Sequence, residues 1–360
     1  MTAAAPVPEP MAAPTPALVC PVCGEATALG DVFCEACGAD LPPTTAPPPP
    51  AGATADEVHD EGLSLPTTST FAAPCPSCGA AGVEIVEGYC GVCGMKQPAP
   101  RDHLEAVADR VAAVTDRGRR HHRNEDAFAM AVTDDGRVVA VVCDGVSTTV
   151  DPDAASQAAA DAALAVLVAA GPDALPAAHA AARDAVLALS WTPDPRLGAP
   201  SCTFLAAVVD GAHVEMATLG DCRSLWLPDE GEARTLTQDD SWAAEAIAAG
   251  AKTAEEAYAD HRAHVITRWL GADADPAWEA RPSSFTAPGR GRLLLCSDGL
   301  WNYAETAAEV AVAALPPEGE ADADLLTPAR RLVDFANAAG GSDNVTVVLV
   351  ALPHPKGPAA

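Results

Sequence analysis

The sequence predicts an α+β fold, in which antiparallel sheets are covered by helices, preceded by two small zinc-binding modules. Three observations lead to this prediction. Eight of the twelve cysteines form four C-x2-C pairs within the first hundred residues, whereas the chain beyond about residue 105 alternates between short β-rich runs and longer alanine-rich segments. Turn sequences such as TDDG and VVDGAH separate neighbouring β-rich runs, as is typical of hairpins. Long helices inserted between groups of strands favour helix-covered sheets over a parallel doubly wound fold.

The length and the net charge of the chain limit the kinds of protein that it can be. The chain has 360 residues and a formal net charge of −29. The length suits a catalytic domain of about 250 residues with an appendage. The charge argues against nucleic acid or an anionic membrane surface as an electrostatically bound partner. The N-terminus lacks the basic and apolar regions of a signal peptide, and no stretch holds about 18 uninterrupted apolar residues, so we expect a soluble, cytoplasmic protein.

The N-terminal cysteines predict two separate four-sulfur zinc sites. A C-x2-C pair puts two thiolates on one tight turn, and two such turns complete the tetrahedral cage that Zn²⁺ accepts. A glycine follows each pair, where a positive φ lets backbone N–H groups turn toward the sulfurs. A disulfide framework is the alternative, but the cytosol keeps thiols reduced. The first site comprises Cys20, Cys23, Cys34 and Cys37, and the second Cys75, Cys78, Cys90 and Cys93.

These pairs resemble a double zinc ribbon, with a first ribbon over residues 18–40 and a second over 73–98. The connecting residues 41–72 are rich in Pro, Thr and acidic residues and lack apolar periodicity, which predicts a semi-extended linker. Lys96 is the one basic residue among the first hundred, against eleven acidic residues. This balance favours a protein-binding or structural role for the ribbons over nucleic-acid binding.

The second module, over residues 105–352, is predicted to alternate between strands and helices. Its candidate strands are β-rich or apolar runs bounded by turns. They are expected at 111–115, 126–132, 137–143, 203–209, 212–218, 222–227, 292–296 and 345–351. The candidate helices have apolar residues at intervals of three and four. They are expected at 153–170, 174–190, 241–250, 305–314 and 328–339.

Acidic residues stand at the ends of several predicted strands. Asp144 and Asp298 each follow an apolar run and precede a glycine, Asp343 precedes the last run, and Asp126 and Asp221 occupy two further strand boundaries. Singly, an Asp-Gly after a strand is usually only a turn. Antiparallel neighbours begin and end at a shared edge, however, so these carboxylates can meet. Clustered carboxylates need cations to stay ionised, and oxygen ligands select Mg²⁺ or Mn²⁺ rather than Zn²⁺.

Eight motifs follow one another in the second module. They are TDRGRRHHRNEDA, VVCDGV, CTFLAAVV, LGDCRSLWL, LTQDDS, HVITRWLG, LLLCSDGLW and SDNVTVVLV. In order and rough spacing, over about residues 108–352, they resemble the metal-dependent protein phosphatases of type 2C, the PPM family. The resemblance implies two antiparallel β-sheets packed face to face and flanked by helices, an αββα sandwich. It also implies a binuclear Mn²⁺ or Mg²⁺ centre at one end of the sandwich.

The resemblance assigns roles around this centre. It implies that Asp144 bridges the two ions, that Gly145 contributes its backbone carbonyl, and that Asp298 and Asp343 hold one ion. Asp126 belongs with these as a catalytic acid. The full set of implied metal ligands is Glu125, Asp126, Asp144, Gly145, Asp221, Asp298 and Asp343.

Three of these ligands have more peripheral implied roles. Glu125 and Asp126 match the acidic pair that contacts the second ion, largely through water, and Asp221 matches an acid that helps to hold a weaker third ion. Two ions about 3.5–4 Å apart lower the pKa of a bridging water, so that hydroxide can attack phosphorus near neutral pH. A nucleophilic cysteine is not required. The four remaining cysteines are interpreted as buried structural thiols: Cys143, Cys202, Cys222 and Cys296.

The sequence departs from the family at the phosphate-binding position. Counted from Asp116, the arginine that grips phosphate in the family falls on His121. Arg120 and Arg123 flank it and can substitute, or a protonated His121 can bind phosphate as a weaker donor. A solvated loop is the alternative for this stretch. The sequence VST follows the DG aspartate, where some members carry a histidine, so protonation of the leaving group would fall to metal-bound water.

The sequence as a whole predicts a protein serine/threonine phosphatase that opposes a Ser/Thr kinase and acts on phosphorylated protein substrates as a monomer, with the ribbons recruiting a partner. Residues 239–264 match the family's flap beside the active site, with Trp242 and Tyr258 as candidates for substrate contact, although an ordinary pair of surface helices also fits. One alternative is a catalytically weak regulator that binds phosphoproteins. Another is a nucleic-acid tether, against which the acidic N-terminal region argues.

Overall fold

The computed structural model describes residues 97–317 and 322–352 continuously. In the N-terminal part it describes the shorter segments 18–19, 26–27, 69–70, 75, 78–82, 84–86 and 89–95. The chain divides into two units, Met1–Pro48 and Pro49–Ala360. The first unit contains a hairpin of β1 (Leu18–Val19) and β2 (Ala26–Thr27). The cysteines of the predicted first zinc site lie outside the described residues.

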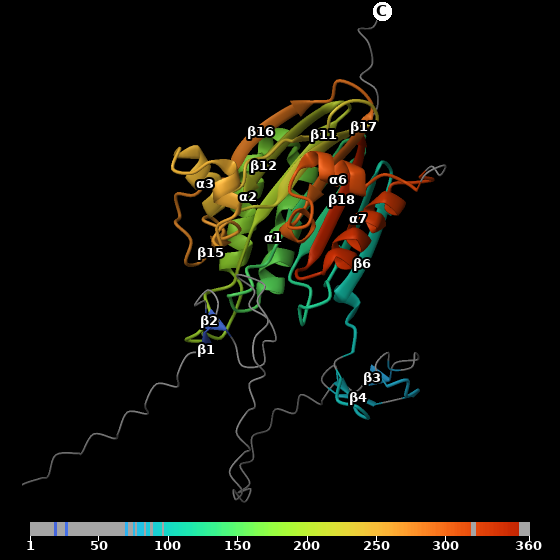
Figure 1. Cartoon of the computed structure of the whole chain (residues 1–360), viewed down its shortest axis with the longest axis vertical. Coiled ribbons are helices and arrows are strands. Elements are labelled where there is room, and N and C mark those ends of the chain that lie inside the picture. Colours follow the sequence, from blue (N-terminus) through green and yellow to red (C-terminus); the bar gives the residue numbers. More distant parts are fainter. Residues whose placement is uncertain are drawn as a thin grey trace, which may run out of the picture. The chain divides into compact units, whose positions relative to one another are not determined.

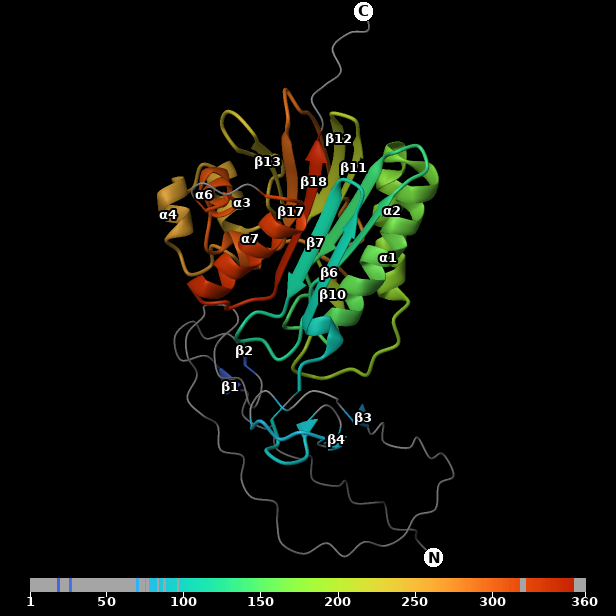
Figure 2. The same ribbon diagram turned by 90° about the vertical axis from the view of Figure 1, so that its right-hand side faces the viewer.

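The second module is built on two antiparallel sheets (Figures 1 and 2). Sheet I has the order β16-β12-β11-β9-β8, and sheet II the order β14-β13-β17-β18-β7-β6. The strands of sheet I are β8 (Ala127–Val132), β9 (Val138–Cys143), β11 (Phe204–Asp210), β12 (His213–Leu219) and β16 (Arg281–Thr286). Those of sheet II are β6 (His103–Ala108), β7 (Val111–Asp116), β13 (Arg223–Pro228), β14 (Arg234–Thr235), β17 (Gly291–Cys296) and β18 (Val345–Leu352).

The central strands are buried on both faces, which explains their continuous apolar sequences. Successive side chains of a strand point to opposite faces, so each strand contributes to two cores. In β9, Val139 and Val141 pack under the helices of sheet I, whereas Val138 and Val142 pack between the two sheets. Strand β17 likewise divides its leucines between the inter-sheet core and the helices of sheet II. The two sheets therefore share one apolar layer.

Helices cover the outer face of each sheet (Figure 2). Helices α1 (Pro152–Ala170) and α2 (Leu175–Leu187) pack together on sheet I. Sheet II is covered by α5 (Asp298–Trp301), α6 (Ala307–Ala313) and α7 (Leu326–Ala339). Among the described residues, α1 alone is long and apolar enough to cross a membrane. Its buried face, with Ala155, Ala159 and Ala163, packs on the sheet, so it is a core helix.

The predicted αββα sandwich is confirmed, and all eight expected strands and five expected helices are present within a few residues of their predicted bounds. The elements that the sequence does not predict are short or lie at sheet edges. The strands missed are β6, β14, β16 and the pair β10 (Ser201–Cys202) and β15 (Leu270–Gly271). The helices missed are α5 and α4 (Ala254–Tyr258), which follows the predicted helix α3 (Trp242–Ala248). The N-terminal region adds a sheet of β3 (Ser69–Thr70), β4 (Glu84–Val86) and β5 (Tyr89–Cys90). Two short turns of 3₁₀ helix complete the described elements: η1 (Pro100–Asp102) precedes β6, and η2 (Pro172–Ala174) lies between α1 and α2.

Candidate active site and four-cysteine site

Strand register brings the predicted acidic residues to one end of both sheets. Ala127 of β8 pairs with Cys143 of β9, so Asp126 and Asp144 extend these strands at the same edge. On sheet II, Asp298 follows β17, and Asp343 precedes β18, which pairs with β17 in antiparallel register. Asp221 precedes β13, which begins opposite the end of β17. We call Asp126, Asp144, Asp221, Asp298 and Asp343 the acidic cluster.

Asp126 joins the two sheets. Its Oδ2 accepts hydrogen bonds from Ser297 Oγ and Thr346 Oγ1, both at 2.7 Å. Asp126 directly precedes β8 of sheet I, whereas Ser297 directly follows β17 and Thr346 lies in β18, both of sheet II. Its Oδ1 is buried and has no hydrogen-bond partner. Burial raises the pKa of Asp126 to about 6, although the two hydroxyl donors lower it. One carboxylate oxygen is thus fixed in place, and the other is left for a ligand.

Asp144 and Asp298 are crowded by other acids. Burial, followed by the charges of neighbouring acids in the cluster, raises the pKa of both carboxyl groups well above the usual range. Asp298 Oδ2 accepts a hydrogen bond from Asn302 Nδ2 at 3.1 Å, whereas its Oδ1 is buried without a partner. Asp221 is 2% exposed, and burial, with the nearby charge of Asp239, raises its pKa to about 8. Such groups stay ionised together only where cations balance them.

His121 lies inside this acidic region. Its side chain is 3% exposed, with Nε2 3.1 Å from Asp343 Oδ1 and Nδ1 3.9 Å from Glu125 Oε2. Burial acts to raise the pKa of Asp343, but the charge and hydrogen bond of His121 outweigh it and lower that pKa. The structure therefore places His121 against a predicted metal ligand, because its imidazole ring contacts the carboxylate of Asp343.

The neighbouring residues of the same loop are also placed. Arg123 Nε donates to Glu125 Oε1 at 2.8 Å, and Arg123 Nη1 lies 3.5 Å from Asp153 Oδ1. Ser147 Oγ donates to Glu125 Oε2 at 2.5 Å. Both carboxylate oxygens of Glu125 therefore bond protein groups, which fits the implied contact with a metal through water better than direct coordination. Arg120 is exposed at the surface of this loop.

Gly145 is confined by the surrounding backbone. A Cβ atom at this position would lie 2.7 Å from the carbonyl oxygens of both Glu125 and Pro152, closer than real Cβ contacts. The chain after Asp144 can pass between these carbonyls only because residue 145 has no side chain. The Asp-Gly pair is thus a packing requirement of the site as well as a turn.

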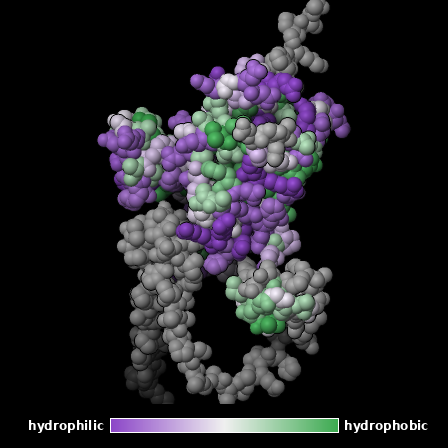
Figure 3. Space-filling view, turned by 45° about the vertical axis from the view of Figure 1, so that its right-hand side comes forward, coloured by the Kyte–Doolittle hydropathy of each residue, from purple (hydrophilic) through white to green (hydrophobic). Residues whose placement is uncertain are grey.

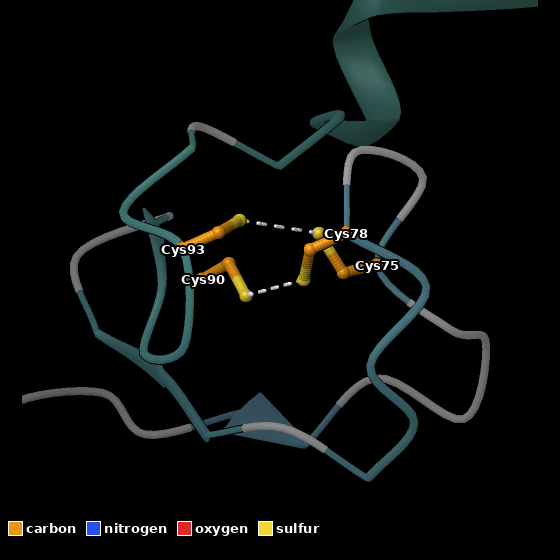
Figure 4. A group of neighbouring side chains, drawn as sticks. All are labelled: Cys75, Cys78, Cys90 and Cys93. Carbon is orange, nitrogen blue, oxygen red and sulfur yellow. Dashed lines mark hydrogen bonds between the residues drawn. The ribbon is translucent and has the colours of Figure 1, made fainter.

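The four described cysteines of the second ribbon form a compact cluster (Figure 4). The four Sγ atoms of Cys75, Cys78, Cys90 and Cys93 lie within 4.8 Å of one another, and Gln97 Nε2 donates to Cys75 Sγ at 3.3 Å. The glycines after the pairs, Gly79 and Gly94, have φ of 71° and 70°, and their N–H groups bond the carbonyls of Cys75 and Cys90. The predicted cage of two matching turns is present here.

The acidic cluster is arranged differently from the cysteines. Within the described part of the chain, the cysteines are the one group of three or more candidate ligand atoms that all approach within 4.8 Å of each other. The carboxylates are spaced more widely, as suits ligands shared between two ions rather than gathered on one. The unpartnered oxygens of Asp126 and Asp298, and the raised pKa values, show that the residues fit divalent cations bound by oxygen.

The predicted flap residues form a small core of their own. Trp242 stacks under Arg262, whose guanidinium carbon lies 4.1 Å from the ring centre, and Lys252 Nζ lies 5.1 Å from the same ring. Tyr258 packs with Trp242 on the cluster of small residues between α3 and α4. Both aromatic residues are half-buried, so their first role is to hold the flap together.

Sequence reasoning does not identify the polar residues that support the acids. These are Ser297, Thr346, Asn302 and Asn344. Asn344 shows why: its Oδ1 accepts a hydrogen bond from Glu125 N at 2.7 Å across 219 residues of sequence. The one available signal was adjacency, because Ser297 and Asn344 stand beside Asp298 and Asp343. The other four cysteines are buried, and burial raises the pKa of Cys296 to about 12, as expected for structural thiols.

Comparison with known proteins agrees with this geometry. The serine/threonine phosphatase stp of Listeria welshimeri is 29% identical over 252 residues, which cover 66% of this chain and 93% of that protein. The serine/threonine protein phosphatase PstP of Mycobacterium tuberculosis is 32% identical over 245 residues, 67% of this chain and 44% of that protein. The solved catalytic domain of PstP, in complex with two manganese ions, is 31% identical with a TM-score of 0.54, over 68% of this chain and 98% of that one.

Family models cover both parts of the chain. The model for the double zinc ribbon matches residues 20–94. The model for protein phosphatase 2C matches residues 115–322, more than half of the chain and most of the acidic cluster. With an N-terminal double zinc ribbon, the chain belongs to the protein phosphatase 2C family of serine/threonine protein phosphatases.

Proposed function

We propose that this chain removes phosphate from phosphoserine and phosphothreonine residues of proteins, with two Mn²⁺ or Mg²⁺ ions bound by the acidic cluster. The main support for this proposal is that five aspartates converge at one end of both sheets. Two of these aspartates have a buried carboxylate oxygen without a hydrogen-bond partner. A purely structural cluster would have its carboxylates satisfied by donors. The manganese-bound relative supports the choice of ion.

The residues of the site have two kinds of role: some would bind the metal ions, and others hold the metal-binding residues in place. Asp144, the Gly145 carbonyl, Asp298 and Asp343 would hold the pair of ions, and Asp221 would serve a weaker third. When bound, the ions supply an activated water for in-line attack on phosphorus and neutralise phosphate charge. Ser297 and Thr346 fix Asp126 from the opposite sheet, so that its free oxygen keeps one direction.

His121 and its neighbours organise the phosphate side of the site. His121 Nε2 holds Asp343 in place, so its predicted contact with phosphate requires the ring to exchange an acid partner for the substrate. Arg123 has the same constraint, because it bonds Glu125. Arg120 is exposed on the same loop and, with Arg123, flanks His121, so both arginines remain candidates for phosphate binding.

Turnover of a phosphoserine peptide tests this proposal. The full chain is assayed with added Mn²⁺ and with Mg²⁺, beside an Asp144→Ala variant from the same preparation. Release of inorganic phosphate by the wild type and not by the variant is expected. Binding of the phosphopeptide by the wild type without any release would instead identify a phosphoprotein-binding regulator.

The proposal extends to the zinc ions, to the partner of the ribbons and to the cellular setting of the enzyme. The four-cysteine cluster supports one structural Zn²⁺, and the matching cysteines of the first ribbon support a second. We propose that the ribbons recruit a protein partner and that the enzyme, as a cytoplasmic monomer, opposes a Ser/Thr kinase. In the view of Figure 3, both hydrophilic and hydrophobic residues lie at the surface of the described part of the chain, and neither kind covers the whole face.

A further inference from the structure

Arg101 lies directly behind the acidic segment Asn124–Asp126. It belongs to η1, the turn that leads from the second ribbon into β6, and its guanidinium group reaches away from that turn into the catalytic part. Nε donates to the carbonyl oxygen of Asn124 at 3.0 Å, and Nη2 donates to that of Asp126 at 2.9 Å. One side chain thus binds the backbone on both sides of Glu125.

The same guanidinium also binds the start of α1. Nη1 donates to Gln157 Oε1 at 2.7 Å, and Nη2 lies 3.0 Å from the carbonyl oxygen of Asp153. Ser156, 3.3 Å from Nη2, donates its hydroxyl to the Glu125 carbonyl at 2.5 Å. Arg101 and the first turns of α1 therefore form one hydrogen-bonded bracket around three consecutive carbonyl groups of the acidic segment.

The bracket acts on the backbone and leaves the acidic side chains available. Asp126 directs its carboxylate the other way, toward Ser297 and Thr346, and Glu125 bonds Arg123 and Ser147. Arg101 thus places a positive charge near the acids without using up a carboxylate oxygen. Arg123, by contrast, bonds Glu125 directly.

We propose that Arg101 is a positioning residue that sets the affinity of the acidic cluster for divalent ions. The inference rests on the proposed metal-dependent function. A planar guanidinium with fixed, divergent N–H groups can reach carbonyls on two segments at once, whereas the ammonium of lysine donates from a single point. Groups that orient metal ligands from behind typically change metal affinity by about 10–100-fold when removed.

Calorimetric titration of the zinc-loaded full chain with MnCl₂ tests the proposal. We expect Arg101→Ala to weaken Mn²⁺ binding by about 10-fold or more. Arg101→Lys should restore only part of this affinity, because it cannot bond both segments. Gln157→Ala, which removes one bond of the bracket, should give a smaller loss. Arg330→Ala is the matched control, because Arg330 bonds Glu105 at the surface and should leave Mn²⁺ affinity unchanged.

Turnover measured over a range of Mn²⁺ concentrations separates positioning from chemistry. Since Arg101 touches no substrate, kcat of Arg101→Ala should return toward the wild-type value at saturating Mn²⁺. Unchanged Mn²⁺ affinity in folded Arg101→Ala or Arg101→Lys protein overturns the inference, as does a loss of kcat that saturating Mn²⁺ does not restore. If Arg101→Ala does not fold, the Lys and Gln157 variants decide. A wild-type chain that binds no Mn²⁺ would overturn the proposed function itself.

Discussion

The carboxyl group of Asp144 is surrounded by the other members of the acidic cluster, and burial together with their charges raises its pKa. Asp144→Ala removes a ligand from the centre of this group. We expect turnover of a phosphoserine peptide to fall by several orders of magnitude, without recovery at higher Mn²⁺. Asp334→Ala, which removes an exposed carboxylate from α7, is the control and should be near normal. Near-normal turnover by Asp144→Ala would make the metal-centre assignment untenable.

Asp221 gives the site a pH dependence that stability measurements can detect. Burial, with the charge of Asp239, raises its pKa from the ordinary 3.8 to about 8, so at neutral pH the folded chain binds a proton that the unfolded chain has released. The free energy of unfolding should therefore decrease as pH rises from about 4 to about 8. Asp221→Asn removes this titration, and without added divalent ions the variant should be more stable than the wild type at pH 8.

Thermal unfolding between pH 5 and pH 8.5 checks this expectation. The melting temperature of Asp221→Asn should exceed that of the wild type at the alkaline end by about 2–4 °C for each kcal/mol gained. The difference should shrink toward the acid end. Added Mn²⁺ should reduce the advantage of the variant, because cations stabilise the ionised acid. An equal pH slope in both proteins would contradict the raised pKa.

At the scale of single residues, the acids could be predicted and their partners could not. Each acid borders an apolar run, so the hydrophobic pattern marks its position. The donors to Asp126 lie 171 and 220 residues away in sequence, and only the packing of the two sheets brings them together. The sequence predicts that His121 or a neighbouring arginine binds phosphate. It does not predict the contact between the His121 ring and Asp343, which depends on how the loop folds back.

At the scale of elements, the apolar pattern reveals strands that are buried on both faces and misses those at the edges. Strand β9 is apolar at every position because both of its faces are covered. Edge strand β16, with the sequence RPSSFT, has alternating half-buried and exposed residues and holds its place by pairing with β12. Edge strand β6 is mostly exposed and pairs with β7. Such strands arise from the hydrogen bonds that a neighbour offers, which their own residues do not encode.

We expect the ribbon turns to depend on metal, because their sequences have few apolar residues with which to build a core. We expect the purified chain to carry two Zn²⁺, and Cys75→Ser to carry one, as measured by elemental analysis. Cys20→Ser should lose the other ion, and the double variant both. A wild-type chain without zinc, with its N-terminal cysteines paired as disulfides, would show that the ribbon assignment is wrong.

At the scale of the whole molecule, the predicted catalytic ligands all follow residue 120, so the ribbons should be dispensable for turnover of a small substrate. Excision of residues 1–96 keeps η1 and Arg101 and should leave kcat/KM on a phosphoserine peptide largely intact. The full chain, assayed in parallel, is the control. A collapse of activity in a fragment that remains folded would mean that the ribbons build part of the site.

The bonds from Ser297 and Thr346 to Asp126 have a mechanical consequence. The acid extends from sheet I and its donors from sheet II, so the site exists only while the two sheets keep their alignment. The layer between them consists mainly of aliphatic contacts, which have no directional preference and tolerate a small slide. Hydrogen bonds fail after a displacement of less than 1 Å. Activity should therefore be more sensitive to sheet alignment than the secondary structure is. We expect mild denaturant to abolish turnover before the secondary structure begins to unfold.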